Sequence, residues 1–106
     1  MHDVKEETLF WNIVTGFITR NSSVAVEELC FSVVVVNIGA VAMTVNGIPL
    51  AAPVAPSLLG ESFTFGAHKK DIFRGRIDVG FTGGAGRCAV IQNVYLDYGE
   101  KQTFKK

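Results

Sequence analysis

The stretch Asn37-Ile-Gly-Ala-Val-Ala-Met-Thr-Val-Asn-Gly-Ile-Pro-Leu50 decides the fold class of this chain. An extended run ends at Asn46-Gly47, and apolar residues return directly after it. Asn-Gly between two such runs is the strongest short-range signal of a β-hairpin, because both central residues of a type I′ turn need a positive φ. The stretch therefore predicts an antiparallel β-protein.

Outward from this hairpin, short apolar runs alternate with connections rich in Gly, Pro, Asn and Ser. Asn21-Ser22-Ser23 is typical of a turn, and the proline-containing residues 51–61 are typical of an irregular crossover. We interpret Gly83-Gly-Ala-Gly86 as a hairpin turn rather than a phosphate-binding loop, because a strand follows it instead of a helix. Residues 8–19 are expected to form one bent strand or two short ones, and the longest strand is expected within residues 24–36. The other expected strands are residues 40–45, 48–50, 62–66, 76–82 and 87–96. The pattern predicts an all-β fold: a single antiparallel β-sandwich of about seven strands with a Greek-key or jelly-roll-like path.

The length of 106 residues predicts one domain, residues 1–106. Hydrophobic residues make up 48% of the chain, which is enough to bury a core. The charged residues 1–7 are expected to form a flexible N-terminal arm, and the polar residues 97–106 a flexible C-terminal tail.

The run from Val24 to Val36 is apolar on both faces when read as a strand. Strict alternation places Phe31, Val33 and Val35 on one face and Cys30, Val34 and Val36 on the other. Such a strand is either central and covered on both sides, or has one face covered by a neighbouring subunit.

The two cysteines, Cys30 and Cys88, leave two alternatives open. Their separation resembles that of the bridge between the sheets of an immunoglobulin domain. The other immunoglobulin marks are missing, since the only tryptophan, Trp11, precedes the first cysteine. The second alternative is a pair of buried thiols in a protein made in the cytoplasm.

The charge balance argues against several classes of partner. Ten basic and ten acidic residues give a formal net charge of zero, so neither nucleic acid nor a membrane surface is expected as a partner. The polar N-terminus lacks the pattern of a secretory signal, and no apolar stretch is long enough for a membrane-spanning helix. Zero net charge with a positive mean hydropathy favours a protein that works within an assembly.

No residue pattern indicates catalysis, a metal or a cofactor. The histidines His2 and His68 have no cluster of further ligands, and His68 lies beside Lys69 and Lys70, whose charges repel a cation. The serines lack a nucleophile-elbow context, and adjacent acids such as Glu27-Glu28 point to opposite faces of a strand. We therefore expect a protein that is not an enzyme.

Clusters of charge are the candidate partner-binding residues. The loop from His68 to Arg76 carries four of the ten basic residues against the single acid Asp71, and it is either an ordinary solvated loop or a docking patch for an acidic surface. The oppositely charged ends of the chain suit head-to-tail contacts between subunits. The candidates are Asp3, Glu6 and Glu7 at the N-terminus, Lys69, Lys70, Arg74 and Arg76 in the loop, and Lys101, Lys105 and Lys106 at the C-terminus.

Four segments resemble small accessory proteins of tailed-bacteriophage virions, the compact β-sandwich decoration or auxiliary capsid proteins. They are Asn37-Ile-Gly39, Val45-Asn-Gly-Ile-Pro-Leu50, Gly60-Glu-Ser-Phe-Thr-Phe65 and Gly75-Arg-Ile-Asp-Val-Gly-Phe81. The resemblance implies a structural virion protein, made in the host cytoplasm, that binds other virion proteins as a homo-oligomer or on a lattice. It implies no catalytic residue and leaves head and tail positions open.

Two other functions stay open from the residues. A carbohydrate-binding or adhesion module would display exposed aromatic side chains, for which Trp11, Tyr95 and Tyr98 are the candidates. A small β-barrel enzyme or ligand carrier would need a pocket with convergent polar groups.

Overall fold

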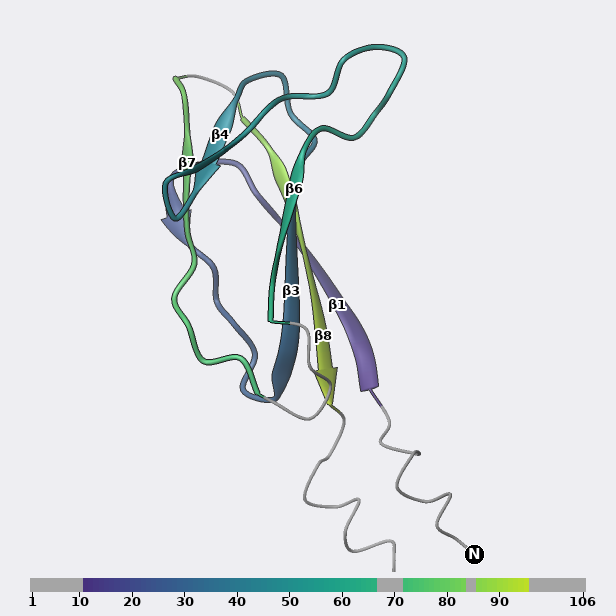
Figure 1. Cartoon of the computed structure of the whole chain (residues 1–106), viewed down its shortest axis with the longest axis vertical. Helices are drawn as coiled ribbons and strands as arrows, with labels where there is room; N and C mark the ends of the chain where they lie inside the picture. Colours follow the sequence, from purple (N-terminus) through teal and green to yellow (C-terminus); the bar gives the residue numbers. More distant parts are fainter. Residues whose placement is uncertain (1–10, 67–71, 84–85, 96–106) are drawn as a thin grey trace, which may run out of the picture.

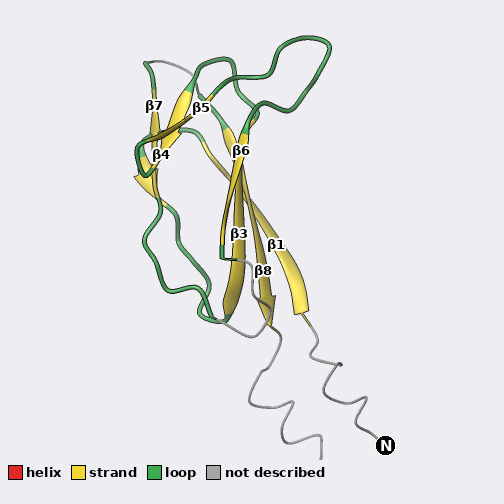
Figure 2. Cartoon of the chain, in the orientation of Figure 1, coloured by secondary structure: helices red, strands yellow, loops and turns green. Residues whose placement is uncertain are grey.

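The computed structural model describes residues 11–66, 72–83 and 86–95, and this part of the chain is all-β without a helix (Figure 2). The strands are β1 (Trp11–Ile18), β2 (Ser22–Ser23), β3 (Cys30–Asn37), β4 (Met43–Val45), β5 (Ile48–Leu50), β6 (Ser62–Phe65), β7 (Asp78–Phe81) and β8 (Cys88–Tyr95).

The strands form two antiparallel sheets of four strands each. The long sheet has the order β1-β8-β3-β6, and the short sheet has the order β2-β7-β4-β5 (Figure 1). The pairs β1·β8, β2·β7, β3·β6 and β4·β5 are nested, with the first strand against the last and the middle two joined by a hairpin. The chain therefore follows one long hairpin whose two arms pass from sheet to sheet together.

The predicted Asn-Gly hairpin is confirmed. Asn46 has φ 51° and Gly47 has φ 84°, and Val45 pairs with Ile48 across the turn. The Asn46 side chain also fastens the turn to the segment just before β7, since its Nδ2 donates to the Arg76 carbonyl at 3.0 Å.

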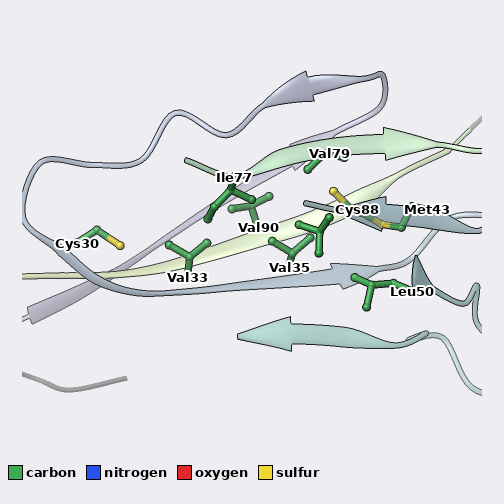
Figure 3. Close-up of a cluster of buried hydrophobic side chains, with 10 residues drawn as sticks. Cys30, Val33, Val35, Met43, Leu50, Ile77, Val79, Cys88 and Val90 are labelled. Atoms are coloured by element: carbon green, nitrogen blue, oxygen red, sulfur yellow. The ribbon is translucent and has the colours of Figure 1, made fainter. Parts of the chain in front are cut away.

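The core lies between the two sheets. Val33, Val35 and Val90 of the long sheet form one buried cluster with Met43 and Val79 of the short sheet (Figure 3). Ile77, directly before β7, is fully buried in the same cluster, and Phe81 packs against it. The alternation of residues 77, 79 and 81 in the sequence predicts this inward face.

A β-bulge in β3 corrects the predicted faces of that strand. Cys30 pairs with Val94 and Ser32 pairs with Asn93, so Phe31 is an extra residue. Because a bulge shifts the alternation by one residue, Cys30 faces the core with Val33, whereas Phe31 lies on the opposite face of the long sheet. The predicted assignment of these two residues is wrong.

The segment between residues 21 and 29 also differs from the prediction. Ser22–Ser23, expected in a turn, pairs with Val79 and Asp78 of β7. Residues 24–29 cross from the short sheet to the long one, and the long strand expected within residues 24–36 begins at Cys30. The crossing backbone bonds to β8 through a side chain and through the main chain. Gln92 accepts from the Glu27 N–H at 2.8 Å and donates to the Ala25 carbonyl at 3.2 Å, and the Tyr95 N–H donates to the Leu29 carbonyl at 3.0 Å.

The hairpin predicted at residues 83–86 is wrong, because β7 and β8, the strands on either side of this segment, do not pair with each other. β7 belongs to the short sheet and β8 to the long sheet, and residues 84–85 between them lie outside the described residues. A strand does follow this segment, as expected. Residues 51–61 form no strand, in agreement with the predicted crossover between β5 and β6.

Candidate interaction surface

The outer face of the long sheet, which points away from the short sheet, is the most distinctive surface of the described residues. The odd-numbered residues of β1 lie on this outer face. Ile13 and Phe17 share it with Asn93 and Ala89 of β8, with which they pair. Trp11, Ile13 and Phe17 are 43%, 55% and 56% exposed. Apolar residues of the neighbouring strands share this face: Val34 and Ile91 are half-buried, and Phe31, Val36, Ala89 and Tyr95 are already buried. We call this set the outer face.

Aromatic rings occupy one end of the outer face. The Trp11 and Phe31 rings meet edge to face with centroids 5.9 Å apart, and the Phe31 and Tyr95 centroids are 4.7 Å apart. The bulge in β3 makes this cluster possible, because it places Phe31 on the side of Trp11. Alternation alone misses this cluster.

Polar side chains also lie on the outer face, since Thr15 pairs with Ile91 and Thr64 pairs with Val34. Asn93 donates to the Ser32 hydroxyl at 3.3 Å, so these two polar side chains bond to each other. The Arg87 guanidinium lies over the Phe17 ring, 4.6 Å from its centroid. A cation at this distance from an aromatic ring is attracted by the ring quadrupole.

A second apolar surface lies on the connection between β5 and β6, which extends beyond the sheets (Figure 1). Val54, Leu58 and Leu59 are 77%, 83% and 62% exposed there. Local bonds order this loop, since the Ser57 N–H donates to the Val54 carbonyl at 2.9 Å. The Asn37 side chain holds the start of the loop by donating to the Leu50 carbonyl at 2.9 Å.

The two described basic residues of the predicted basic loop, Arg74 and Arg76, have different surroundings. The Arg76 Nε donates to both carboxylate oxygens of Asp78, at 2.9 and 3.2 Å, and its Nη2 contacts the Ser23 hydroxyl at 3.3 Å. Arg74 is exposed and borders a hollow of about 270 Å³ that Glu27 and Glu28 also line. The charge of Arg76 is thus matched within the chain, and a docking role for either arginine stays a prediction.

The hydrogen bonds around Asp78 lower the pKa of its carboxyl group. The Ser23 hydroxyl donates to Oδ1 at 2.6 Å and makes the largest contribution, and the Arg76 side chain adds to it. Both interactions favour the charged carboxylate. This exposed cluster links β2 to β7 and serves the fold.

The remaining candidate residues lie outside the described residues. They are Asp3, Glu6, Glu7, Lys69, Lys70, Lys101, Lys105 and Lys106.

Both cysteines are buried free thiols. Cys88 lies opposite Asn37 in the β3·β8 ladder, seven residues along β3 from Cys30. At about 3.3 Å per residue, this places them roughly 20 Å apart, too far for a disulfide. Figure 3 shows the two side chains at opposite ends of the core. Burial raises the pKa of both thiols.

The described part of the chain contains no group of three His, Cys, Asp or Glu side chains placed to hold a metal ion. Within the same residues, no helix has the length and apolar character needed to cross a membrane. Comparisons of the chain with protein families, curated proteins and solved structures found no match.

Proposed function

We propose that this chain is a non-enzymatic structural protein of a tailed-phage virion, a capsid auxiliary or decoration protein or a tail component that binds an assembled lattice. The outer face of the long sheet carries this proposal, because Ile13 and Phe17 are more than half exposed there. A sheet that is apolar on both faces gains stability when both are covered, and neighbouring subunits supply such a cover in an assembly.

The strand order supports a finer description of the fold as a jelly-roll β-sandwich. Eight strands paired first to last, in two sheets of four, are the arrangement expected when one long hairpin rolls up into two layers. Jelly rolls of eight strands occur in viral capsid proteins and in lectins. The architecture is therefore compatible with the virion proposal but does not single it out.

The proposed mechanism is multivalent attachment. Each copy contributes a modest apolar contact through its outer face, and many copies on one lattice add up to firm binding. The zero net charge of the chain limits repulsion between neighbouring copies.

A carbohydrate-binding or adhesion module is the alternative. Trp11 and Phe17 are exposed aromatic side chains on one face, which is a feature of sugar-binding surfaces. Tyr95 is only 3% exposed and is therefore not available as a surface platform, and Tyr98 lies outside the described residues.

A binding experiment separates the two functions. Particles of the phage that carries the gene are purified after the gene has been deleted, and the recombinant full-length chain is added and co-sedimented with them. We expect saturable binding to the particles and no binding on a glycan array. Binding to glycans without binding to particles would support the adhesion module and contradict the virion proposal.

A further inference from the structure

We infer that the edge strand β1 pairs antiparallel with β1 of a second copy of this chain, which joins two long sheets into one continuous sheet. The inference rests on the proposed function and deepens it, because it names a second copy as the first partner in the assembly. Four observations on the described residues support it.

β1 is the longest edge of the two sheets. The edge strands are β1 and β6 in the long sheet and β2 and β5 in the short sheet, with eight, four, two and three residues. β5 also contains Pro49, which lacks an N–H group. Natural proteins protect sheet edges by keeping them short or by placing proline or charge on them. Three edges are protected in this way, and β1 is not.

The sequence of β1 lacks the other protective devices. Trp11-Asn-Ile-Val-Thr-Gly-Phe-Ile18 contains neither a charged residue nor a proline. Its eight residues pair with β8 in an unbroken register, without a bulge to twist the edge away. Figure 1 shows β1 at the outside of the long sheet, with β8 as its neighbour on one side only. Among the described residues, no strand pairs with the other side of β1 from Asn12 to Ile18.

The core is open beneath this edge. A cleft of about 230 Å³ lies between β1, β8 and the crossing segment, and Val14, Ile18, Val24 and Val90 are among the residues that line it. A Cβ atom built on Gly16, which also lines the cleft, would meet no atom within 4 Å. The inward side chains of an added strand would cover this apolar lining.

Self-pairing suits the residues of β1. Around a two-fold axis perpendicular to the sheet, outer-face residues oppose outer-face residues. If the axis passes through Val14, Trp11 lies opposite Phe17 of the second copy. If the axis passes through Thr15, Ile13 lies opposite Phe17 of the second copy. Both are favourable cross-strand pairs. The strand carries no charge and the whole chain has zero net charge, so a second copy meets no net repulsion.

The test uses the full-length chain in solution, with native mass spectrometry and analytical ultracentrifugation over a range of concentrations. Ile13→Lys places a charge on the β1 edge, and Ile48→Lys is the matched control, since Ile48 is 36% exposed on the edge strand β5. We expect a dimer for the unmodified chain and for Ile48→Lys. Ile13→Lys should weaken dimerisation by about tenfold or more while the circular dichroism of the sheets is retained.

Cysteine cross-linking tests the pairing itself. Val14→Cys and Thr15→Cys are prepared separately, with Ser62→Cys on the β6 edge as the control, and the native thiols are buried. A two-fold axis at residue 14 or 15 brings one of the first two cysteines against its own copy, so one variant should form a disulfide-linked dimer under mild oxidation. Failure of both to cross-link, or cross-linking by Ser62→Cys alone, would overturn the inference.

A monomeric chain at every concentration would also overturn the inference, without affecting particle binding, which is measured separately. If the monomer binds particles and β1 gains protection from hydrogen exchange only there, the strand pairs with another virion protein. That result would reject the second copy as partner and leave the proposed function standing.

Discussion

Asn46 and Asp78 bond to each other twice. The Asn46 N–H donates to the Asp78 carbonyl at 2.9 Å, and the Asp78 N–H donates to the Asn46 Oδ1 at 2.7 Å. Asn46 therefore has two roles, because it accepts a positive φ in the turn and also fixes the turn to the start of β7. The hairpin and its neighbouring strand are stabilised together.

The turn gives the first prediction. Gly47→Val should lower the free energy of unfolding by about 1 kcal/mol or more, because a β-branched residue resists a positive φ. The loss would come from the backbone conformation and not from a steric clash, since a Cβ at residue 47 meets no atom within 4 Å. Urea unfolding measures the change, and Gly83→Val, at another glycine with positive φ and free space, is a comparison outside the hairpin. Unchanged stability of Gly47→Val would contradict the assigned turn.

The amide of Asn46 gives a second prediction. Asn46→Gly keeps a residue that tolerates positive φ but removes the side-chain bonds to Arg76 and Asp78. We expect a loss of about 1–2 kcal/mol in the free energy of unfolding, the usual range for one or two hydrogen bonds. A variant as stable as the parent would mean that the turn is not fixed to β7 through this side chain.

The carboxyl group of Asp78 gives a third prediction, on pH. Its pKa is lowered in the folded state, first by the Ser23 hydroxyl and then by Arg76. Its contribution to stability is therefore present above the unfolded pKa of about 3.9 and is lost as the pH falls through the lower folded value. Chemical denaturation at several pH values should show a smaller acid-induced loss for Asp78→Asn than for the parent chain. Parallel pH profiles would contradict this role.

The cysteines give a fourth prediction. Both thiols are buried and their pKa values are raised by burial, so a thiol reagent at neutral pH should label neither in the folded chain. Both should react after unfolding in guanidinium chloride. An intact-mass measurement that finds a Cys30–Cys88 disulfide would contradict the β3·β8 register.

Several features of the fold could be predicted from local signals. Asn46-Gly47 specifies its turn through backbone sterics, and the alternation of Ile77, Val79 and Phe81 specifies a buried face. These signals depend only on nearby residues, so the sequence exposes them directly. The Arg76–Asp78 ion pair also follows from a local signal, because residues two apart in an extended segment point to the same side.

Other features depend on distant partners and could not be predicted in this way. The bulge that turns Phe31 towards Trp11 arises from the register with β8. Ser22–Ser23 is a strand only because β7 lies beside it, and the strand order places β7 and β8 in different sheets. The exposed edge of β1 likewise becomes visible once the order of the sheet is known.

The charged ends of the chain remain a prediction from sequence, because they lie outside the described residues. Deletion of residues 1–7 and 101–106 should leave the fold intact and weaken association with the lattice, and added salt should weaken the binding of the full chain. Co-sedimentation with particles measures both effects. Equal binding by the truncated chain, at low and high salt, would assign attachment to the sheets alone.

The proposed virion role is tested most directly by quantitative mass spectrometry of purified wild-type particles. Particles from the phage that carries the gene are banded on a density gradient, and the amount of this chain is compared with that of the major shell and tail proteins. We predict a fixed ratio of this chain to one of those proteins throughout the particle band. Its absence from the band, with the chain present in the infected-cell lysate, would contradict a structural role in the virion.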